Sequence, residues 1–145
     1  MANQEINSDS NSMKVNFNAI GRITFASNPT AAINLQRLYT PLLTDFKHIP
    51  IVWSLIEQTF PEMETNDQKI LFVAVAYKLY SPGSLLPEKA VNAPAGLRAA
   101  MAKHLKYRNG SNINSWLSFA RVYIKNDRYC KRINKIINDF QVLDN

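Results

Sequence analysis

The chain of 145 residues is long enough to bury a core and short for two domains. Its composition, 46% hydrophobic and 19% charged, excludes a wholly disordered chain. The longest apolar stretch, residues 70–76, is far shorter than the roughly 20 residues of a membrane-spanning helix. The N-terminus lacks the pattern of a secretory signal. We therefore expect a protein that is neither secreted nor embedded in a membrane.

The formal net charge of +6 is concentrated in one part of the chain. Residues 1–96 carry seven Lys or Arg and eight Asp or Glu, whereas residues 97–145 carry ten and three. A basic C-terminal half of this kind favours contact with a polyanion such as DNA, or with an acidic partner. The alternative is an ordinary solvated basic surface.

The N-terminal part begins with a polar tail over residues 1–13, and a single helical domain is expected over residues 14–145. From residue 15 to residue 25 apolar and polar residues alternate, with Ile20 as the one exception. This alternation is typical of a β-strand or of a hairpin that turns at Gly21. Because a lone strand has unpaired edges, we expect it to add to a sheet of another subunit. The residues expected to pair are Val15, Phe17, Ile23 and Phe25.

The pattern that follows predicts an all-α bundle of five or six helices. Asn28 and Pro29 favour a helix start, and this helix is expected to run to about Thr40. Apolar residues at helical spacing predict a second helix, which ends at Pro61.

The helix predicted over residues 66–80 is the most apolar of the chain. Thr65 followed by Gln68 is typical of a capping box at its start. Because apolar residues lie on every side, we expect this helix in the centre of the bundle.

The C-terminal half predicts further helices over residues 97–105 and 112–125, after a loop that contains Pro and Gly. The apolar pattern changes phase near Asn126 and Asp127, where we expect a break and a new helix. The alternative is one long helix that contacts two different partners.

Residues that could carry catalysis do not form a recognisable pattern. One Cys and two His do not supply a common four-ligand zinc site, and the four Gly are too far apart for a phosphate loop. The acidic residues Glu62, Glu64 and Asp67 lie near a helix start, where they complement the helix dipole. We therefore expect no enzyme activity, cofactor, metal or small-molecule substrate.

Two function classes remain. The first is a non-enzymatic assembly protein, such as a connector or ring component of a bacteriophage particle, in the virion or the cytoplasm of a bacterial host. The 16 Asn and 13 Ile of the chain are typical of an AT-rich genome, which motivates this origin. The second is a helix-turn-helix-like DNA-binding protein for replication or transcription, formed by residues 97–105 and 112–125.

Both hypotheses assign polyanion or nucleic-acid binding to the C-terminal half. Asn112 and Asn114 lie at the start of the second helix, where base-reading side chains would stand. The remaining candidates are Lys and Arg residues that could contact phosphate groups. The full set is Arg98, Lys103, Lys106, Arg108, Asn112, Asn114, Arg121, Lys125, Arg128, Lys131, Arg132 and Lys135.

Overall fold

The computed structural model describes residues 14–86 and 92–144, so the predicted tail over residues 1–13 lies outside the described part. Within these ranges the protein has seven α-helices, two short 3-10 helices and no strand. The chain divides into two compact units, one ending at Arg37 and one beginning at Leu38. The expected all-α class is confirmed, and the seven α-helices of the described residues exceed the five or six predicted.

The first unit contains α2 (Phe17–Ser27) and the larger part of α3 (Pro29–Tyr39). The predicted strand or hairpin over residues 15–25 is wrong. A helix satisfies its backbone groups within its own segment, whereas a lone strand leaves them unpaired. The start of α2 is stabilised by Asn16, whose side-chain oxygen accepts a hydrogen bond from the backbone N–H of Ala19 at 3.0 Å.

Because this segment is a helix, the four residues predicted to pair with a partner strand lie on α2 or just before it. Val15 precedes α2, and the other three lie on it, so none takes part in a sheet: Phe17, Ile23 and Phe25. The predicted start of the next helix is confirmed, because the Asn28 side chain accepts a hydrogen bond from the N–H of Ala31 at 3.1 Å.

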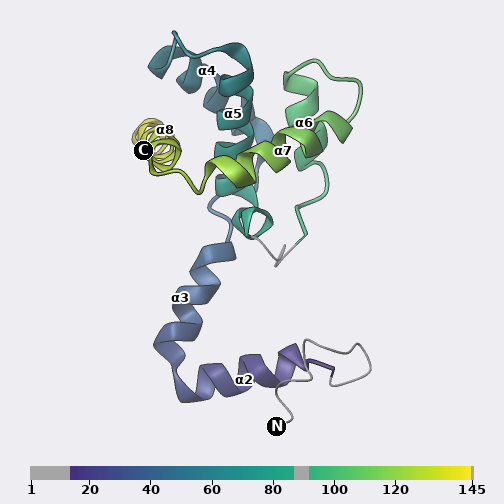
Figure 1. Cartoon of the computed structure of the whole chain (residues 1–145), viewed down its shortest axis with the longest axis vertical. Helices are drawn as coiled ribbons and strands as arrows, with labels where there is room; N and C mark the ends of the chain where they lie inside the picture. The colour runs from purple at the N-terminus through teal and green to yellow at the C-terminus, as the bar shows by residue number, and fades with distance from the viewer. Residues whose placement is uncertain (1–13, 87–91, 145) are drawn as a thin grey trace. The chain divides into compact units, whose positions relative to one another are not determined.

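The second unit is a helical bundle built around α5 (Thr65–Tyr80). In Figure 1 the other helices of this unit surround α5, which packs directly against α4, α7 and α8. Eleven of its sixteen residues are buried, as expected for a helix that is apolar on every side. The surrounding elements are η2 (Phe46–His48), α4 (Ile49–Thr59), η3 (Pro82–Leu85), α6 (Leu97–His104), α7 (Ser111–Tyr123) and α8 (Asp127–Asp144).

The predicted capping box at the start of α5 is wrong. Thr65 is already the first helical residue, and the preceding Glu64 makes no side-chain capping hydrogen bond. The amide of Gln68 instead donates to the carbonyl oxygen of Phe60 at 3.1 Å. Gln68 therefore ties the end of α4 to α5, because α4 approaches closely enough to offer this acceptor.

The predicted break between the last two helices is confirmed. α7 ends at Tyr123 and α8 begins at Asp127, and the rings of Tyr123 and Tyr129 stack across the break at 4.4 Å. α7 packs against α5 and α6, whereas α8 packs against α4 and α5. The change of phase lets each helix turn its apolar side toward different neighbours. In the described residues no helix has both the length and the hydropathy of a membrane span.

Candidate functional site

The predicted polyanion-binding residues are distributed over α6, α7, α8 and the connecting segments, and several contact other groups of the protein. Arg121 donates from Nε and Nη2 to the carbonyl oxygen of Ser84, at 3.0 and 2.8 Å. The ammonium group of Lys135 lies 3.0 Å from a carboxylate oxygen of Asp139. These two cations therefore have partners within the fold.

Arg132 also contacts groups of the protein itself. Its guanidinium lies 5.7 Å from the ring centroid of Phe60 and 5.2 Å from that of Tyr129. The same side chain lines a hollow that contains three acidic residues, which disfavour an anionic ligand there. The acidic residues are Glu62, Glu64 and Asp67.

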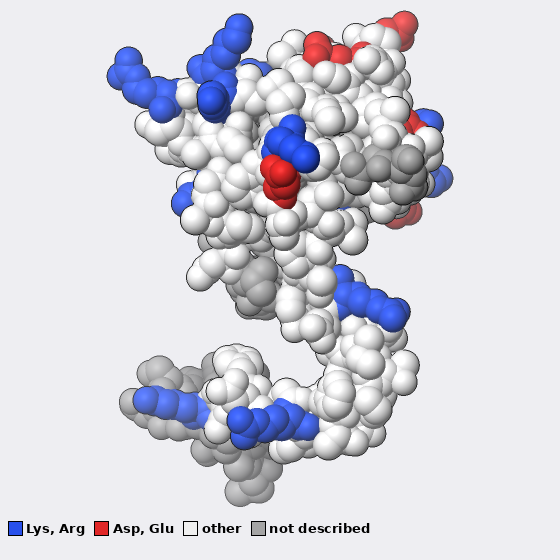
Figure 2. Space-filling model, turned by 180° about the vertical axis from the view of Figure 1, so that it is seen from behind, with Lys and Arg blue, Asp and Glu red and all other residues white. Residues whose placement is uncertain are grey.

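Six other predicted cations are exposed and form no ion pair among the residues that the structure describes. Figure 2 shows one group of basic side chains on the face seen there, over the region of α6 and the turn that follows it. Exposed cations without internal partners are the groups that attract a polyanion through its charge. They are Lys103, Lys106, Arg108, Lys125, Arg128 and Lys131.

The two helices of the predicted helix-turn-helix are α6 and α7, joined by a turn over residues 105–110. Four exposed residues of α7 follow one another at spacings of three, four and three residues, which places them in one stripe along the helix. The stripe carries two polar residues, Asn112 and Ser115, followed by two apolar ones, Phe119 and Val122, which are 52% and 62% exposed. This stripe contains no cation and is only half polar, which is unlike a helix that reads base edges.

Asn114 does not belong to this stripe. Its side-chain oxygen accepts a hydrogen bond from Nη1 of Arg98 at 3.1 Å. Both residues line a cavity of about 910 Å³, which we call the α6–α7 cavity. It is bounded by the C-terminal part of α5, η3, residues 92–96, α6, the turn and α7. The structure thus brings Arg98, Asn114 and Arg121 together around one space.

Tyr77 also lines this cavity, although the sequence predicts it only as a core residue and not as a binding residue. Its side chain is 1% exposed and lines the cavity. No hydrogen bond to its hydroxyl occurs among the described residues. Burial raises the pKa of Tyr77, while the positive charges of Arg98 and Arg121 act in the opposite direction. The hydroxyl is therefore protonated at neutral pH and available as a donor.

The close approach of the turn to α6 shapes one wall of the cavity. A Cβ atom at Gly110 would lie 3.1 Å from the Cβ of Arg98, closer than nine in ten real contacts of this kind. Gly110 therefore lets the chain pass next to Arg98. α6 itself begins after Gly96, whose φ of +91° is in the left-handed region that favours glycine.

A second candidate surface lies on the first unit, because no residue of α2 or α3 is buried. Phe17 and Ile23 are 77% and 64% exposed. Together with Ile20 they follow a spacing of three residues, which places them on the same side of α2. Up to Arg37, where this unit ends, the large apolar residues exposed on α2 and α3 are Phe17, Ile20, Ile23, Phe25, Ile33 and Leu35. We call this set the N-terminal apolar surface.

The described residues contain no group of three or more His, Cys, Asp or Glu side chains that could hold a metal ion. None of the protein-family models, curated proteins or solved structures compared with the chain matches it. The α6–α7 cavity, the exposed cations and the N-terminal apolar surface are therefore the features that bear on function.

Proposed function

We propose that the protein is a non-enzymatic assembly protein that joins neighbouring subunits through α2 and α3. The observation that carries this proposal is the N-terminal apolar surface, on two helices that bury no side chain. Helices of about 11 residues are marginal in water, and in proteins most of their stability comes from packing an apolar side. A neighbouring subunit that covers this surface would supply the missing packing.

The charge of these helices is consistent with an apolar contact. Arg22 is the only charged residue of α2 and Arg37 the only one of α3. The contact would therefore require little removal of water from charged groups. It should persist at high salt, because screening weakens ionic contacts and not apolar ones.

The basic half over residues 97–145 has a separate role in this proposal, which is to meet DNA or an acidic partner. The six exposed cations without an internal ion pair support it. A small connector or ring component of a bacteriophage particle, in the virion or the host cytoplasm, would combine both contacts. The alternative, a helix-turn-helix-like regulator, has less support because Phe119 and Val122 occupy the outward side of α7.

Light scattering after gel filtration tests the assembly proposal. We expect the wild-type protein to have a mass above the 16.5 kDa of one chain, in low and in high salt. The double variant Phe17→Asp, Ile23→Asp should return to one chain while keeping its helical circular dichroism. The matched control Asn18→Asp, Ala26→Asp adds the same two charges at exposed positions and should keep the wild-type mass.

The absorbance ratio at 260 and 280 nm across the same peak tests the role of the basic half. Nucleic acid that co-elutes at low salt and is released at high salt would support contact with phosphate groups. A wild-type protein that is a single chain under all conditions would contradict the assembly proposal. An unchanged mass of the Phe17 and Ile23 double variant would contradict the assigned surface.

A further inference from the structure

We propose that the α6–α7 cavity binds a phosphate ester, held by Arg98, Arg121 and Tyr77. This inference is independent of assembly through α2 and α3, since the cavity lies entirely within the second unit.

The charge of the cavity is the first argument. Arg98 and Arg121 line it, and none of the described residues of its wall is Asp or Glu. Each guanidinium is held by a neutral oxygen, that of the Asn114 amide or the Ser84 carbonyl. Their positive charges are therefore oriented by the fold and not neutralised by it. A group with negative charge would compensate both.

The remaining donors are the second argument. Arg121 uses Nε and Nη2 in its contact with Ser84, and Arg98 uses Nη1 in its contact with Asn114. Among the described residues no hydrogen bond involves Nη1 of Arg121 or Nη2 of Arg98. Guanidinium groups offer donors in a geometry that matches phosphate oxygens. Both guanidinium groups therefore keep donors that can contact the oxygens of a phosphate ester in the cavity.

Tyr77 is the third argument and is independent of the two cations. No buried side-chain nitrogen or oxygen atom of the described residues lacks a hydrogen-bond partner, so the hydroxyl of Tyr77 is itself accessible from the cavity. Tyr77 is 1% exposed, lines the cavity and has no partner among the described residues. Because this hydroxyl stays protonated, it would donate to an oxygen of the ligand. Ser111 places the positive end of the α7 dipole at the same cavity.

The size of the cavity indicates which molecules can carry the phosphate. A volume of about 910 Å³ lies within the range of about 300–1,000 Å³ that is typical of small-molecule sites. It is much larger than an inorganic phosphate ion. The phosphate group can belong to a free nucleotide or to a nucleic-acid strand, which share the same chemistry.

Calorimetric titration of the full chain separates these sources. The probes are inorganic phosphate, adenosine monophosphate and a single-stranded 12-nucleotide DNA. Tyr77→Phe should weaken the binding of the phosphate ester about fivefold, because it removes one hydrogen bond and keeps the ring. Arg98→Gln should weaken it at least about tenfold, because a charge-assisted bond is lost. The control Lys78→Gln removes one charge from an exposed position of α5 outside the cavity and should bind normally.

If the variants weaken the binding of adenosine monophosphate to the expected extents, the result would support a site for a free phosphate ester. Binding of the DNA alone, with the same order of variants, would support the same chemistry and assign the phosphate to a nucleic acid. The proposal would be overturned if none of the probes binds the wild-type protein. It would also be overturned if Lys78→Gln weakens binding as much as Arg98→Gln, or if Tyr77→Phe has no effect while retaining the wild-type fold.

Discussion

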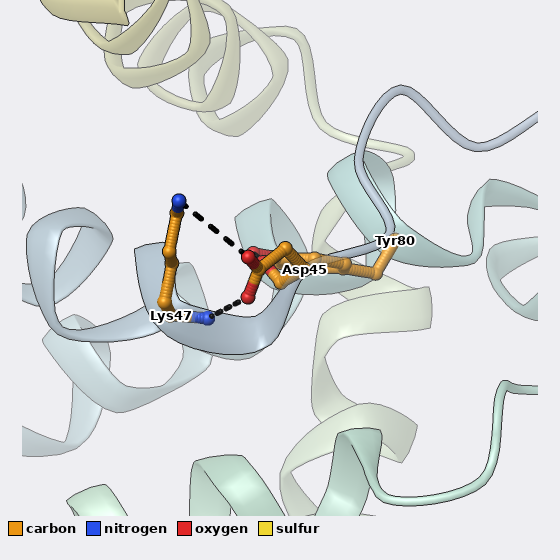
Figure 3. Close-up of polar contacts among 3 residues, drawn as sticks. All are labelled: Asp45, Lys47 and Tyr80. Atoms are coloured by element: carbon orange, nitrogen blue, oxygen red, sulfur yellow. Dashed lines mark hydrogen bonds and ion pairs between the residues drawn. The ribbon is translucent and has the colours of Figure 1, made fainter.

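The hydroxyl of Tyr80 is a buried group whose removal should change how stability depends on pH. Tyr80 is fully buried at the end of α5, and its hydroxyl donates to the carbonyl oxygen of Asp45 at 2.5 Å. Figure 3 shows the two residues together with Lys47, whose ammonium group lies 3.6 Å from a carboxylate oxygen of Asp45. Burial and, to a smaller extent, the charge of Asp45 raise the pKa of Tyr80 to about 12.

The size of the effect follows from this pKa and the ordinary value of 10. The folded protein holds the phenolic proton more tightly than the unfolded chain does. The corresponding stability is therefore complete below pH 10 and is lost as the pH rises from 10 toward 12. At pH 11 the loss amounts to about 1.4 kcal/mol of the free energy of unfolding.

The variant Tyr80→Phe keeps the ring, which meets that of Phe46 edge-on at 5.3 Å, and cannot ionise. At pH 8 it should be about 1 kcal/mol less stable than the wild type, because the Asp45 carbonyl loses its donor. This difference should disappear between pH 10 and 11 and then reverse. Urea unfolding of both proteins from pH 8 to 11, followed by circular dichroism, measures it. A difference that stays constant over this range would refute the reasoning.

The remaining predictions concern single residues. Gly96→Ala should destabilise the protein by about 1–2 kcal/mol, because alanine is strained in the left-handed region and its Cβ would lie 3.1 Å from the Phe46 ring. The control Gly21→Ala, at a helical position with open space around it, should not destabilise the protein. If both variants lower the melting temperature equally, the explanation given for Gly96 is wrong. His104, whose ring lies 6.0 Å from that of Trp53, has a pKa lowered by burial. Its neutral form should stabilise the fold fully above about pH 6.5 and less as the pH falls, so the wild type should be less stable at pH 5.5 than at 7.5. His104→Gln should reduce this pH dependence in urea unfolding, and an undiminished dependence would contradict the role given to His104.

The sequence indicates the centre of the bundle and the break before α8 because both depend on local patterns. Residues 66–80 are apolar on every side, which only a helix surrounded by others can accommodate. The apolar residues after Asn126 follow a different phase from those before it, and a single straight helix cannot turn both sets toward the same partner. These features need no knowledge of distant contacts.

The sequence predicts a strand over residues 15–25, where the helix forms, because the apolar residues of this segment fit both the period of a strand and that of a helix. Phe17 and Ile23 agree with alternation, and they also agree with a spacing of three when Ile20 is included. Ile20, the exception to the alternation, was therefore the residue that favoured a helix. The short segment contains too few apolar positions for periodicity to decide, and Asn16 could act as a cap only in the helical alternative.

The α6–α7 cavity depends on contacts between distant parts of the chain. The sequence indicates Arg98, Asn114 and Arg121 as candidates for binding a polyanion, but periodicity does not show that they surround a common space. That arrangement requires the close passage of Gly110 beside Arg98 and the contact of Arg121 with Ser84. Tyr77 could not be separated from its apolar neighbours, because a pattern of buried positions does not show where a hydroxyl points.

The central position of α5 also has a consequence for synthesis of the chain. Its apolar residues are covered in part by α8, whose Phe140 is made long after Tyr80. At about 5–20 residues per second, translation takes several seconds to add the part of the chain between them. During that time the most apolar helix lacks one of its covering helices. The nascent protein therefore has a window in which chaperones can bind and aggregation can begin.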